Sequence, residues 1–363
     1  MTLTESLPDI RWQETWGLAL TDRPQAFAGL PRAAYDQLSG WNASTLKTVA
    51  LKTEAHAWQE HLNPDRVIEQ DQGAFLVGNI THTSLLEPEL FDERYLELPP
   101  GAPGQPTAKQ LEEPKPRKDG TVNTETKVYA TWLEAKERQA WWDRFREDHR
   151  QLATAQLVPA SELALGTACA TAVRSHPAVG PLFADAPLHR RANELTLTWL
   201  DPILKVRCKA RLDALRFLGD RLWVGDLKTA INAAPGPDGF ARDAERFGYL
   251  LSATWYLDGA RYCREPIEQL LDLPEGTLIT APGGYTFEWI AIEKARPRPE
   301  FVGRYLLTDE QQEAARPVIR RAFERAVQAE ASGWWAGYDT AAKPLELAPY
   351  GYTRLARLAE ALA

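Results

Sequence analysis

The most constraining feature of this sequence is residues 193–230, where three alternating segments are separated by short turns. The first two segments, 193–201 and 206–218, are joined at Asp201–Pro202, and the third, 220–230, follows a turn at Gly219–Asp220. Apolar residues that recur every second position are typical of β-strands, because successive side chains point to opposite faces. We therefore expect a three-strand meander at the centre of the chain.

Patterns typical of helices lie on both sides of this meander. They cover 39–62, 73–91, 131–152, 161–183, 240–263 and 309–335. Pro88 should stop the second of these, and Pro317 should break or kink the last. A further strand pattern covers 285–295. This order predicts an α/β or α+β fold, with one mixed central sheet flanked by helices.

The 363 residues are enough for one large domain or two ordinary ones. Residues 1–35 are mixed and interrupted by proline, so we expect an N-terminal arm. Residues 36–350 should form the main domain, and 351–363 a C-terminal tail. Within the main domain, 98–125 is rich in proline, glycine and charge, which predicts a mobile loop or insertion.

Charge and cysteine content narrow the functional classes. A formal net charge of −8 gives no support to a generally basic nucleic-acid binder, although it does not exclude a local basic channel. The 3 cysteines are scattered, which suits a reducing cytoplasm better than a disulfide framework or a zinc site. We see no signal peptide and no run of 18 apolar residues, so we expect a cytoplasmic protein without a membrane span.

The stretch VGDLKTA, residues 224–230, places Asp226 and Lys228 on one face of the third strand. Asp213 lies thirteen positions earlier on the second strand, and Glu194 opens the first. Converging carboxylates repel each other unless a cation lies between them, and Mg²⁺ prefers oxygen ligands. A nearby lysine can orient or deprotonate water or stabilise a phosphoryl transition state. The pattern therefore fits metal-assisted phosphodiester hydrolysis, although a simple salt bridge would give the same tripeptide.

Several basic residues near these acids are candidates for substrate contact. Lys209 and Arg211 alternate along the strand of Asp213, so we expect them to share its face. They would either contact phosphate or balance the carboxylates. Arg242 and Arg246 lie one helical turn apart, which fits a phosphate clamp and a solvated helix face equally.

Six sequence blocks, in the same order, resemble the PD-(D/E)XK nuclease superfamily. Within it they are most similar to the C-terminal domain of RecE-type exonucleases, the exodeoxyribonuclease VIII-like proteins of phages and prophages. The resemblance runs from about Ser44 to Leu347 and is poor over 98–150. The six blocks are STLKTVALKTEAHA, GNITHTSLLEPELFDERY, AVRSHPAVGPLF, ELTLTWLDPILKVRCKARLDAL, VGDLKTAINAAPGPDGFARDAERFGYLLSATWYLDG and FEWIAIEKARP.

The resemblance implies a role for each candidate. Asp213 and Asp226 would bind the metal, and Lys228 would be the catalytic lysine. His82 would be a further ligand or lie beside the metal, and Glu194 would make a water-mediated or second-metal contact. The backbone carbonyl of Leu227 would be a possible additional ligand.

One position departs from the family pattern. The helix after the catalytic strand usually carries a glutamine between two tyrosines. Tyr249 and Tyr256 match those tyrosines, but Ser252 takes the place of the glutamine. Its short hydroxyl cannot reach as an amide does, which affects how the scissile nucleotide would be positioned.

The resemblance implies a Mg²⁺-dependent exodeoxyribonuclease, with Mn²⁺ also suited to the ligands. It would act 5′ to 3′ on linear duplex DNA in the cytoplasm of a bacterial host, as a homo-oligomeric ring. The 3′ single-stranded tails would serve recombination through a single-strand annealing protein. Two alternatives remain: a DNA-end binding module on a decayed nuclease fold, which Ser252 favours, and a structural protein that keeps a buried acid–lysine pair.

Overall fold

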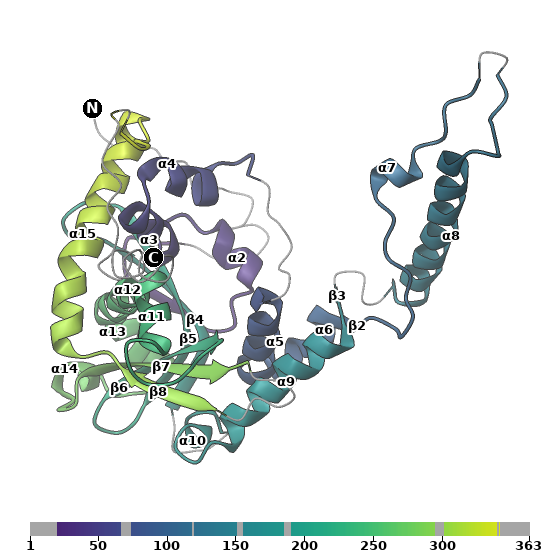
Figure 1. Ribbon diagram of the computed structural model, residues 1–363. Coiled ribbons are helices and arrows are strands. Elements are labelled where there is room, and N and C mark those ends of the chain that lie inside the picture. The colour runs from purple at the N-terminus through teal and green to yellow at the C-terminus, as the bar shows by residue number, and fades with distance from the viewer. Residues whose placement is uncertain are drawn as a thin grey trace, which may run out of the picture.

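The computed structural model describes residues 20–66, 74–117, 120–150, 155–184, 190–294, 301–339 and 341. Its centre is a six-stranded mixed sheet with helices on both faces (Figure 1). The strands lie in the order β1 (Gln25–Phe27), β4 (Arg190–Leu200), β5 (Arg207–Phe217), β6 (Leu222–Ala230), β7 (Tyr285–Glu293) and β8 (Val302–Leu306). The predicted α/β class, with one mixed sheet flanked by helices, is confirmed.

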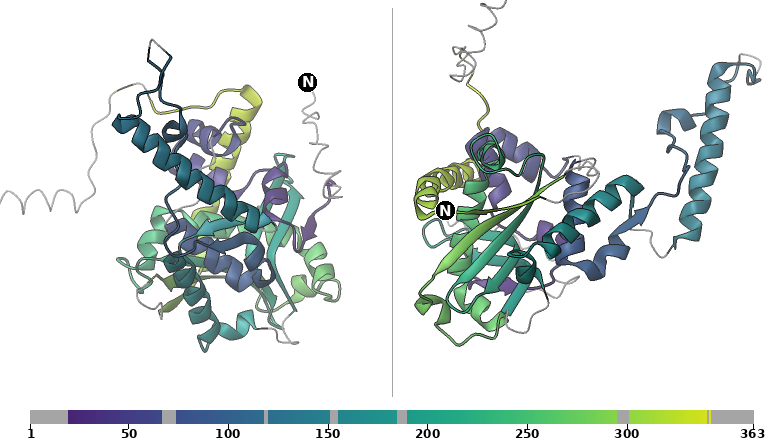
Figure 2. Two further views of the ribbon diagram at one scale, coloured as in Figure 1. Left: turned by 90° about the vertical axis from the view of Figure 1, so that its right-hand side faces the viewer. Right: turned by 60° about the horizontal axis from the view of Figure 1, so that its bottom comes forward.

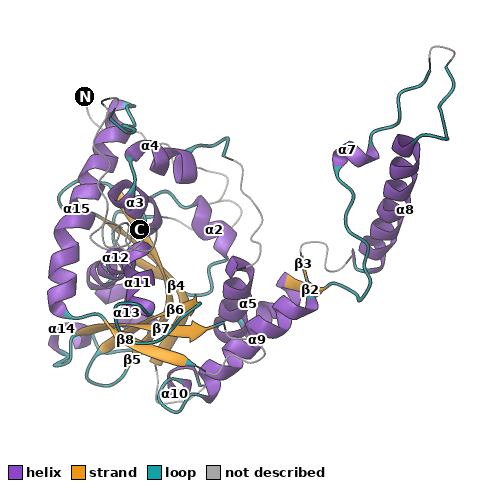
Figure 3. Ribbon diagram, viewed as in Figure 1, coloured by secondary structure: helices purple, strands orange, loops and turns teal. Residues whose placement is uncertain are grey.

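Two apolar layers enclose this sheet. The larger core packs the sheet against α3 (Ala43–Leu51), α11 (Phe240–Arg246), α12 (Tyr249–Tyr262), α13 (Arg264–Leu270) and α15 (Asp309–Ser332). The second core packs Trp223, Leu227 and Ile290 against α5 (Ala74–Leu86), α9 (Ala160–Ser175) and α10 (Gly180–Phe183). Figure 3 shows these helices on the two sides of the strands. Strands buried on both faces explain the nearly continuous apolar character of β6.

The connectivity follows the predicted meander and then crosses over. β4, β5 and β6 are successive antiparallel neighbours, whereas β6 and β7 are parallel. A parallel pair needs a long crossover, and α11 to α14 (Thr277–Thr280) provide it. The edge strands β1 and β8, which we did not predict, pair antiparallel with β4 and β7.

The β5–β6 pairing ends where the acidic residues begin. It runs from Phe217 opposite Leu222 to Ala214 opposite Gly225 and stops there. Further along β5, the free edge bonds instead to Trp41, through Trp41 N to Arg207 O at 2.9 Å and Lys209 N to Trp41 O at 2.8 Å. The two strands therefore separate just where Asp213 and Asp226 would face each other.

The neighbouring strand β4 is distorted at the same level. Glu194 has a φ of 47°, in the left-handed region that non-glycine residues seldom adopt. Ala192, Leu195 and Leu197 nevertheless all pack into the larger core. The two-residue alternation is thus shifted by one position around Glu194. A simple alternating pattern cannot place side chains correctly across this point.

A long extension projects from the sheet domain (Figure 1 and Figure 2, right). Its stem is the parallel pair β2 (Tyr95–Glu97) and β3 (Gln156–Val158), and its body is α7 (Ala108–Leu111) with α8 (Lys127–Asp148). Trp142 Nε1 donates to Pro103 O at 2.9 Å, which holds the loop against α8. The stretch 98–125, predicted as a mobile loop or insertion, thus contains a short capped helix and lies against a long one.

Other boundaries differ from the sequence pattern. Residues 25–27, within the predicted N-terminal arm, form β1, and the end of that arm at residue 35 falls inside α2 (Arg32–Gln37). Lys52 interrupts the first predicted helix before α4 (Glu54–Ala57) and the π-helical turn η1 (Trp58–Leu62). Gly248, with a φ of 62°, divides the 240–263 helix, whereas α15 continues through Pro317. Residues 1–19 and the predicted tail lie outside the described residues. No helix among the described residues is both long and apolar enough to cross a membrane.

Candidate metal and nuclease site

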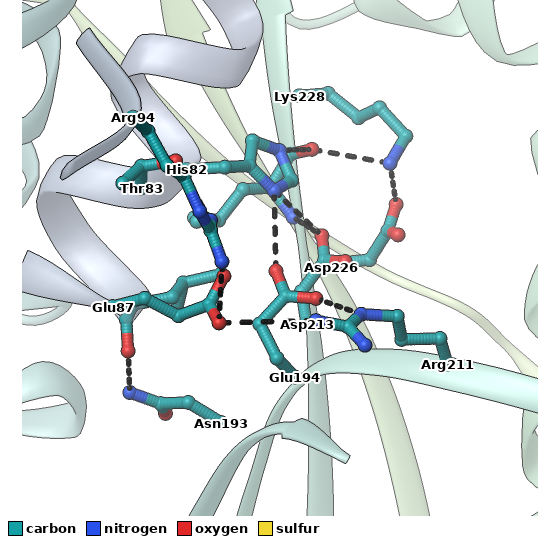
Figure 4. Close-up of polar contacts among 12 residues, drawn as sticks. His82, Thr83, Glu87, Arg94, Asn193, Glu194, Arg211, Asp213, Asp226 and Lys228 are labelled. Atoms are coloured by element: carbon teal, nitrogen blue, oxygen red, sulfur yellow. Dashed lines mark hydrogen bonds and ion pairs between the residues drawn. The ribbon is translucent and has the colours of Figure 1, made fainter. Parts of the chain in front are cut away.

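Strand β6 presents Asp226 and Lys228 as an ion pair, as their spacing predicted (Figure 4). Lys228 Nζ also donates to the carbonyl oxygen of Leu227 at 3.1 Å. The backbone N–H of Leu227 donates to Asp213 Oδ2 at 2.8 Å. Because β5 and β6 have separated here, the Asp213 carboxylate takes the place of the missing strand partner. One short segment of β6 is thereby joined to both acids and to the lysine.

His82 reaches this segment from α5, which packs on β6. Its Nε2 lies 3.1 Å from Leu227 O, so Nε2 carries the hydrogen and donates it. Its Nδ1 lies 3.7 Å from Asp213 Oδ2 and 3.9 Å from Glu194 Oε1. A histidine that donates one N–H to a backbone carbonyl is oriented to bind a metal through its other nitrogen. Nδ1 is the atom that faces the two carboxylates.

Glu194 is held from the opposite side by an ion pair with Arg211 Nε. Arg211 also lies 3.8 Å from Glu87 Oε1, and Glu87 forms a bidentate pair with Arg94 at 2.7 and 3.0 Å. Glu87 begins the segment that follows α5, and Arg94 ends α6 (Phe91–Arg94). This row of alternating charges links the end of α5 to the distorted strand β4. It fixes where the Glu194 carboxylate lies.

The electrostatics are those of acids gathered around a cation. Burial would raise the pKa of Glu194, but His82 and Arg211 lower it to about 2. Burial raises the pKa of Asp213 to about 6, with His82 opposing and Asp226 adding to the rise. Burial would lower the pKa of His82, but Asp213 and Glu194 raise it to about 9. The cluster therefore favours a positive charge among its carboxylates.

The donor atoms of His82, Glu194 and Asp213 all lie within 4.8 Å of one another. Ligands on opposite sides of an ion that binds oxygen at roughly 2.0–2.6 Å are about 4–5 Å apart, so the spacing fits such an ion. The two carboxylates are ligands of the kind that suits Mg²⁺ or Mn²⁺. Leu227 O, a predicted ligand, accepts hydrogen bonds from His82 and Lys228, so both its lone pairs are engaged.

Comparisons with known proteins leave the family open. No protein-family model matches the chain, and no curated protein matches it. Four chains of solved structures match, among them the crystal structure of a "putative exonuclease" from Eubacterium rectale. That chain is 12% identical, has a TM-score of 0.43, and the match covers 85% of this chain and 91% of that one.

The predicted substrate residues divide into two groups. Tyr249 borders the site, with Lys228 Nζ 5.4 Å from its ring centroid. Ser252 is buried within α12, and Tyr256 stacks on Phe287 at 6.3 Å. Arg246 is exposed, with its guanidinium 5.2 Å from the ring of Phe247.

Lys209 and Arg211 instead hold the segment that contains α2. Lys209 is only 4% exposed, and its Nζ donates to Tyr35 O at 2.9 Å and Leu38 O at 2.7 Å. Arg211 NH1 donates to Leu30 O at 2.6 Å. Lys209 lies further along β5 than Arg211, beneath the segment that contains α2 and away from the acids. Of the two, only Arg211 also reaches the acidic cluster, through Glu194.

Sequence reasoning missed three residues near the site: Glu87, Arg94 and Lys47. Glu87 and Arg94 lie in the block that also carries His82, and their spacing of seven residues gave no signal of pairing. Lys47 lies on α3, where its Nζ is 5.9 Å from the ring centroid of Tyr249. On the sequence alone Lys47 is one of several helix lysines, and only the packing of α3 against α12 brings it to the site.

Proposed function

We propose that this protein is a metal-dependent nuclease that hydrolyses phosphodiester bonds at the ends of linear duplex DNA. The observation that carries the proposal is the convergence on His82 Nδ1 of the Asp213 and Glu194 carboxylates, beside the Asp226–Lys228 pair. A salt bridge alone explains Asp226 and Lys228, but it gives no reason to bury two further acids and a histidine beside them.

Asp213, Asp226 and His82 would hold Mg²⁺ or Mn²⁺, and Glu194 would support the site from its position on Arg211. The metal, when bound, polarises a phosphoryl oxygen and favours ionisation of bound water. Nδ1 is the nitrogen that His82 would offer to the metal, because Nε2–H is occupied by Leu227 O, and the Nδ1 proton would leave when the metal binds. Lys228 carries the charge that would stabilise the developing phosphoryl oxyanion and align the attacking water.

The resemblance to RecE-type exonucleases supports finer features of the proposal. The enzyme would degrade 5′ to 3′ and leave 3′ single-stranded tails, which a single-strand annealing protein would take up in recombination. It would act as a homo-oligomeric ring, since a ring can remain closed around its DNA. Duplexes labelled at the 5′ or the 3′ end test polarity, and sedimentation of the full chain tests assembly.

The activity is tested by incubating linear duplex with Mg²⁺ and measuring the release of nucleotides. We expect release by the wild type, loss of release in Asp226→Asn, and none when EDTA replaces Mg²⁺. The matched control is Asp220→Asn, an acid in the β5–β6 turn that pairs with its exposed neighbour Arg221. Binding of duplex ends without any release would instead favour the end-binding module. Equal release by wild type and Asp226→Asn would show that this is not the active site.

A further inference from the structure

A cation without an acidic partner lies beside the proposed active site. Lys47 has no hydrogen bond or ion pair within the part of the chain that the structure describes, yet it is half-buried. The charged side chains that act on Lys47 are Lys228 and Asp226. Burial, together with Lys228, lowers the pKa of Lys47 to about 8. Lys228 is paired with Asp226 and also lies near Asp213, so Lys47 adds a further positive charge beside Lys228 that no acid among the described residues pairs with. Such an unpaired charge is stable if the natural ligand brings negative charge.

The position of Lys47 is set by packing and not by a salt bridge. A Cβ built on Gly248 would lie 3.4 Å from Lys47 Cδ and 3.0 Å from Leu51 Cδ1. The side-chain stem of Lys47 therefore lies against the left-handed turn between α11 and α12. Its ammonium lies 5.9 Å from the ring of Tyr249, which Lys228 approaches at 5.4 Å. The ammonium groups of both lysines therefore approach the ring of Tyr249.

The exposed aromatic residue Phe247 packs against Tyr249. Phe247 is 45% exposed, and its ring lies 5.8 Å from that of Tyr249 with an interplanar angle of 26°. The guanidinium of Arg246 lies 5.2 Å from the centroid of the Phe247 ring. Leu51, 51% exposed, lies at the same turn through its contact with Gly248. An apolar surface with cations around it is the arrangement that binds unpaired nucleotides, whose bases stack while their phosphates pair with lysine or arginine.

We propose that Lys47 and Phe247 form a subsite for an unpaired nucleotide next to the scissile phosphate. Lys47 pairs with its phosphate, and Phe247 stacks on its base. The proposal rests on the proposed nuclease function and sharpens its substrate: the strand reaches the site single-stranded, so the end of a duplex must open first. A base in a duplex has its faces covered by its neighbours, so Phe247 discriminates between the two forms.

The test is equilibrium binding of a fluorescent single-stranded DNA oligonucleotide to the full chain in EDTA at low salt, measured by anisotropy. We expect Phe247→Ala to weaken binding about tenfold, as loss of one stacked base should. Phe247→Trp should bind like the wild type. The matched control is Tyr262→Ala, an exposed aromatic at the far end of α12. It should change nothing, since about 20 Å of helix separates it from Tyr249.

Lys47 is tested in the same assay through its salt dependence. Lys47→Gln should lower the slope of log affinity against log salt by about 0.7, the value for one phosphate contact on a single strand, whereas Lys47→Arg should retain it. Phe247→Ala should weaken binding without changing the slope. Thermal unfolding confirms that each variant is folded.

The outcomes separate this subsite from the proposed function. Wild-type affinity in both Phe247→Ala and Lys47→Gln would overturn the subsite and leave the nuclease proposal intact. An equal loss for a blunt duplex and a single strand in Phe247→Ala would overturn the stacking role. Failure of the wild type to bind any DNA would overturn both proposals.

Discussion

The Nε2 atom of His82 lies 3.1 Å from the carbonyl oxygen of Leu227, although 145 residues separate them in sequence. This contact turns the other ring nitrogen toward Asp213 and Glu194. It also ties α5 to the strand that carries Asp226 and Lys228. As the proposed metal ligand, His82 must lose a proton before a metal can bind, and the first two predictions depend on that exchange.

Metal binding should release protons. His82, with a pKa raised to about 9 by Asp213 and Glu194 against the effect of burial, is protonated at neutral pH without metal. Mg²⁺ or Mn²⁺ can bind only the neutral imidazole, so affinity should rise between pH 6.5 and 9. Calorimetry in two buffers of different ionisation enthalpy measures the proton release. His82→Ala should weaken binding and abolish that release, and unchanged release would exclude His82 as a ligand.

The metal-free protein should lose stability over the same interval. A histidine whose pKa is raised on folding stabilises the fold fully below its unfolded value of about 6.5, and this contribution is lost as pH rises through the folded value of about 9. The loss should reach about 3 kcal/mol at most. Chemical unfolding in EDTA from pH 6 to 9.5 measures it. His82→Gln should flatten this dependence, and the same slope in wild type and variant would contradict the assigned cause.

Removal of the lysine should separate binding from chemistry. In Lys228→Met the Asp226 carboxylate loses its ion-pair partner but remains available as a ligand. We expect metal affinity to be retained and nucleotide release to fall by about 10²-fold or more. Parallel calorimetry and release assays on one preparation provide the measurement. Loss of metal binding together with activity would place Lys228 in the structural support of the site.

Arg211 should matter chiefly because it neutralises a buried acid. Arg211 and Glu194 side chains are 6% and 13% exposed, so Arg211→Met leaves Glu194 without its main partner. Removing one member of a buried pair costs about 3–5 kcal/mol, measurable by chemical denaturation. Glu194→Gln in the same chain should restore part of this loss. Arg146→Met, which removes an exposed pair with Asp143, is the control and should have little effect. No recovery in the double variant would argue against the pairing.

Lys209 should act on the N-terminal segment. Lys209→Met leaves Tyr35 O and Leu38 O without their donor, so the segment around α2 should open more often and be cut more readily in limited proteolysis. DNA affinity of the folded protein should not change, because the ammonium is buried and bonded to carbonyls. A loss of DNA affinity with normal protease resistance would return Lys209 to the substrate site.

The meander and its acids could be predicted because each depends on local information. Alternation over 193–230 identifies the strands, and a charged pair such as Asp226 and Lys228 stands out within an apolar strand. The position of Glu194 could not be predicted, since its left-handed backbone shifts the alternation by one residue. Lys209 lies further along β5, where the segment that contains α2 covers it, so it bonds to that segment and not to the acids.

Other features depend on contacts distant in sequence. β1 has 3 residues and gains its strand character only by pairing with β4. The helix breaks at Gly248, in a turn against which the Lys47 side chain packs. The helical pattern of 240–263 does not reveal this break. Lys47 itself looks like an ordinary helix-surface lysine until α3 is placed against α12.

The carboxylates of β5 and β6, together with His82, are proposed to bind a divalent cation. Diffraction at the manganese absorption edge from a crystal grown with Mn²⁺ can show whether they do. We expect an anomalous peak at bonding distance from Asp213, Asp226 and His82 Nδ1, with Lys228 released from Asp226. A cluster that stays empty under saturating Mn²⁺, with Lys228 still paired to Asp226, would rule out this metal site.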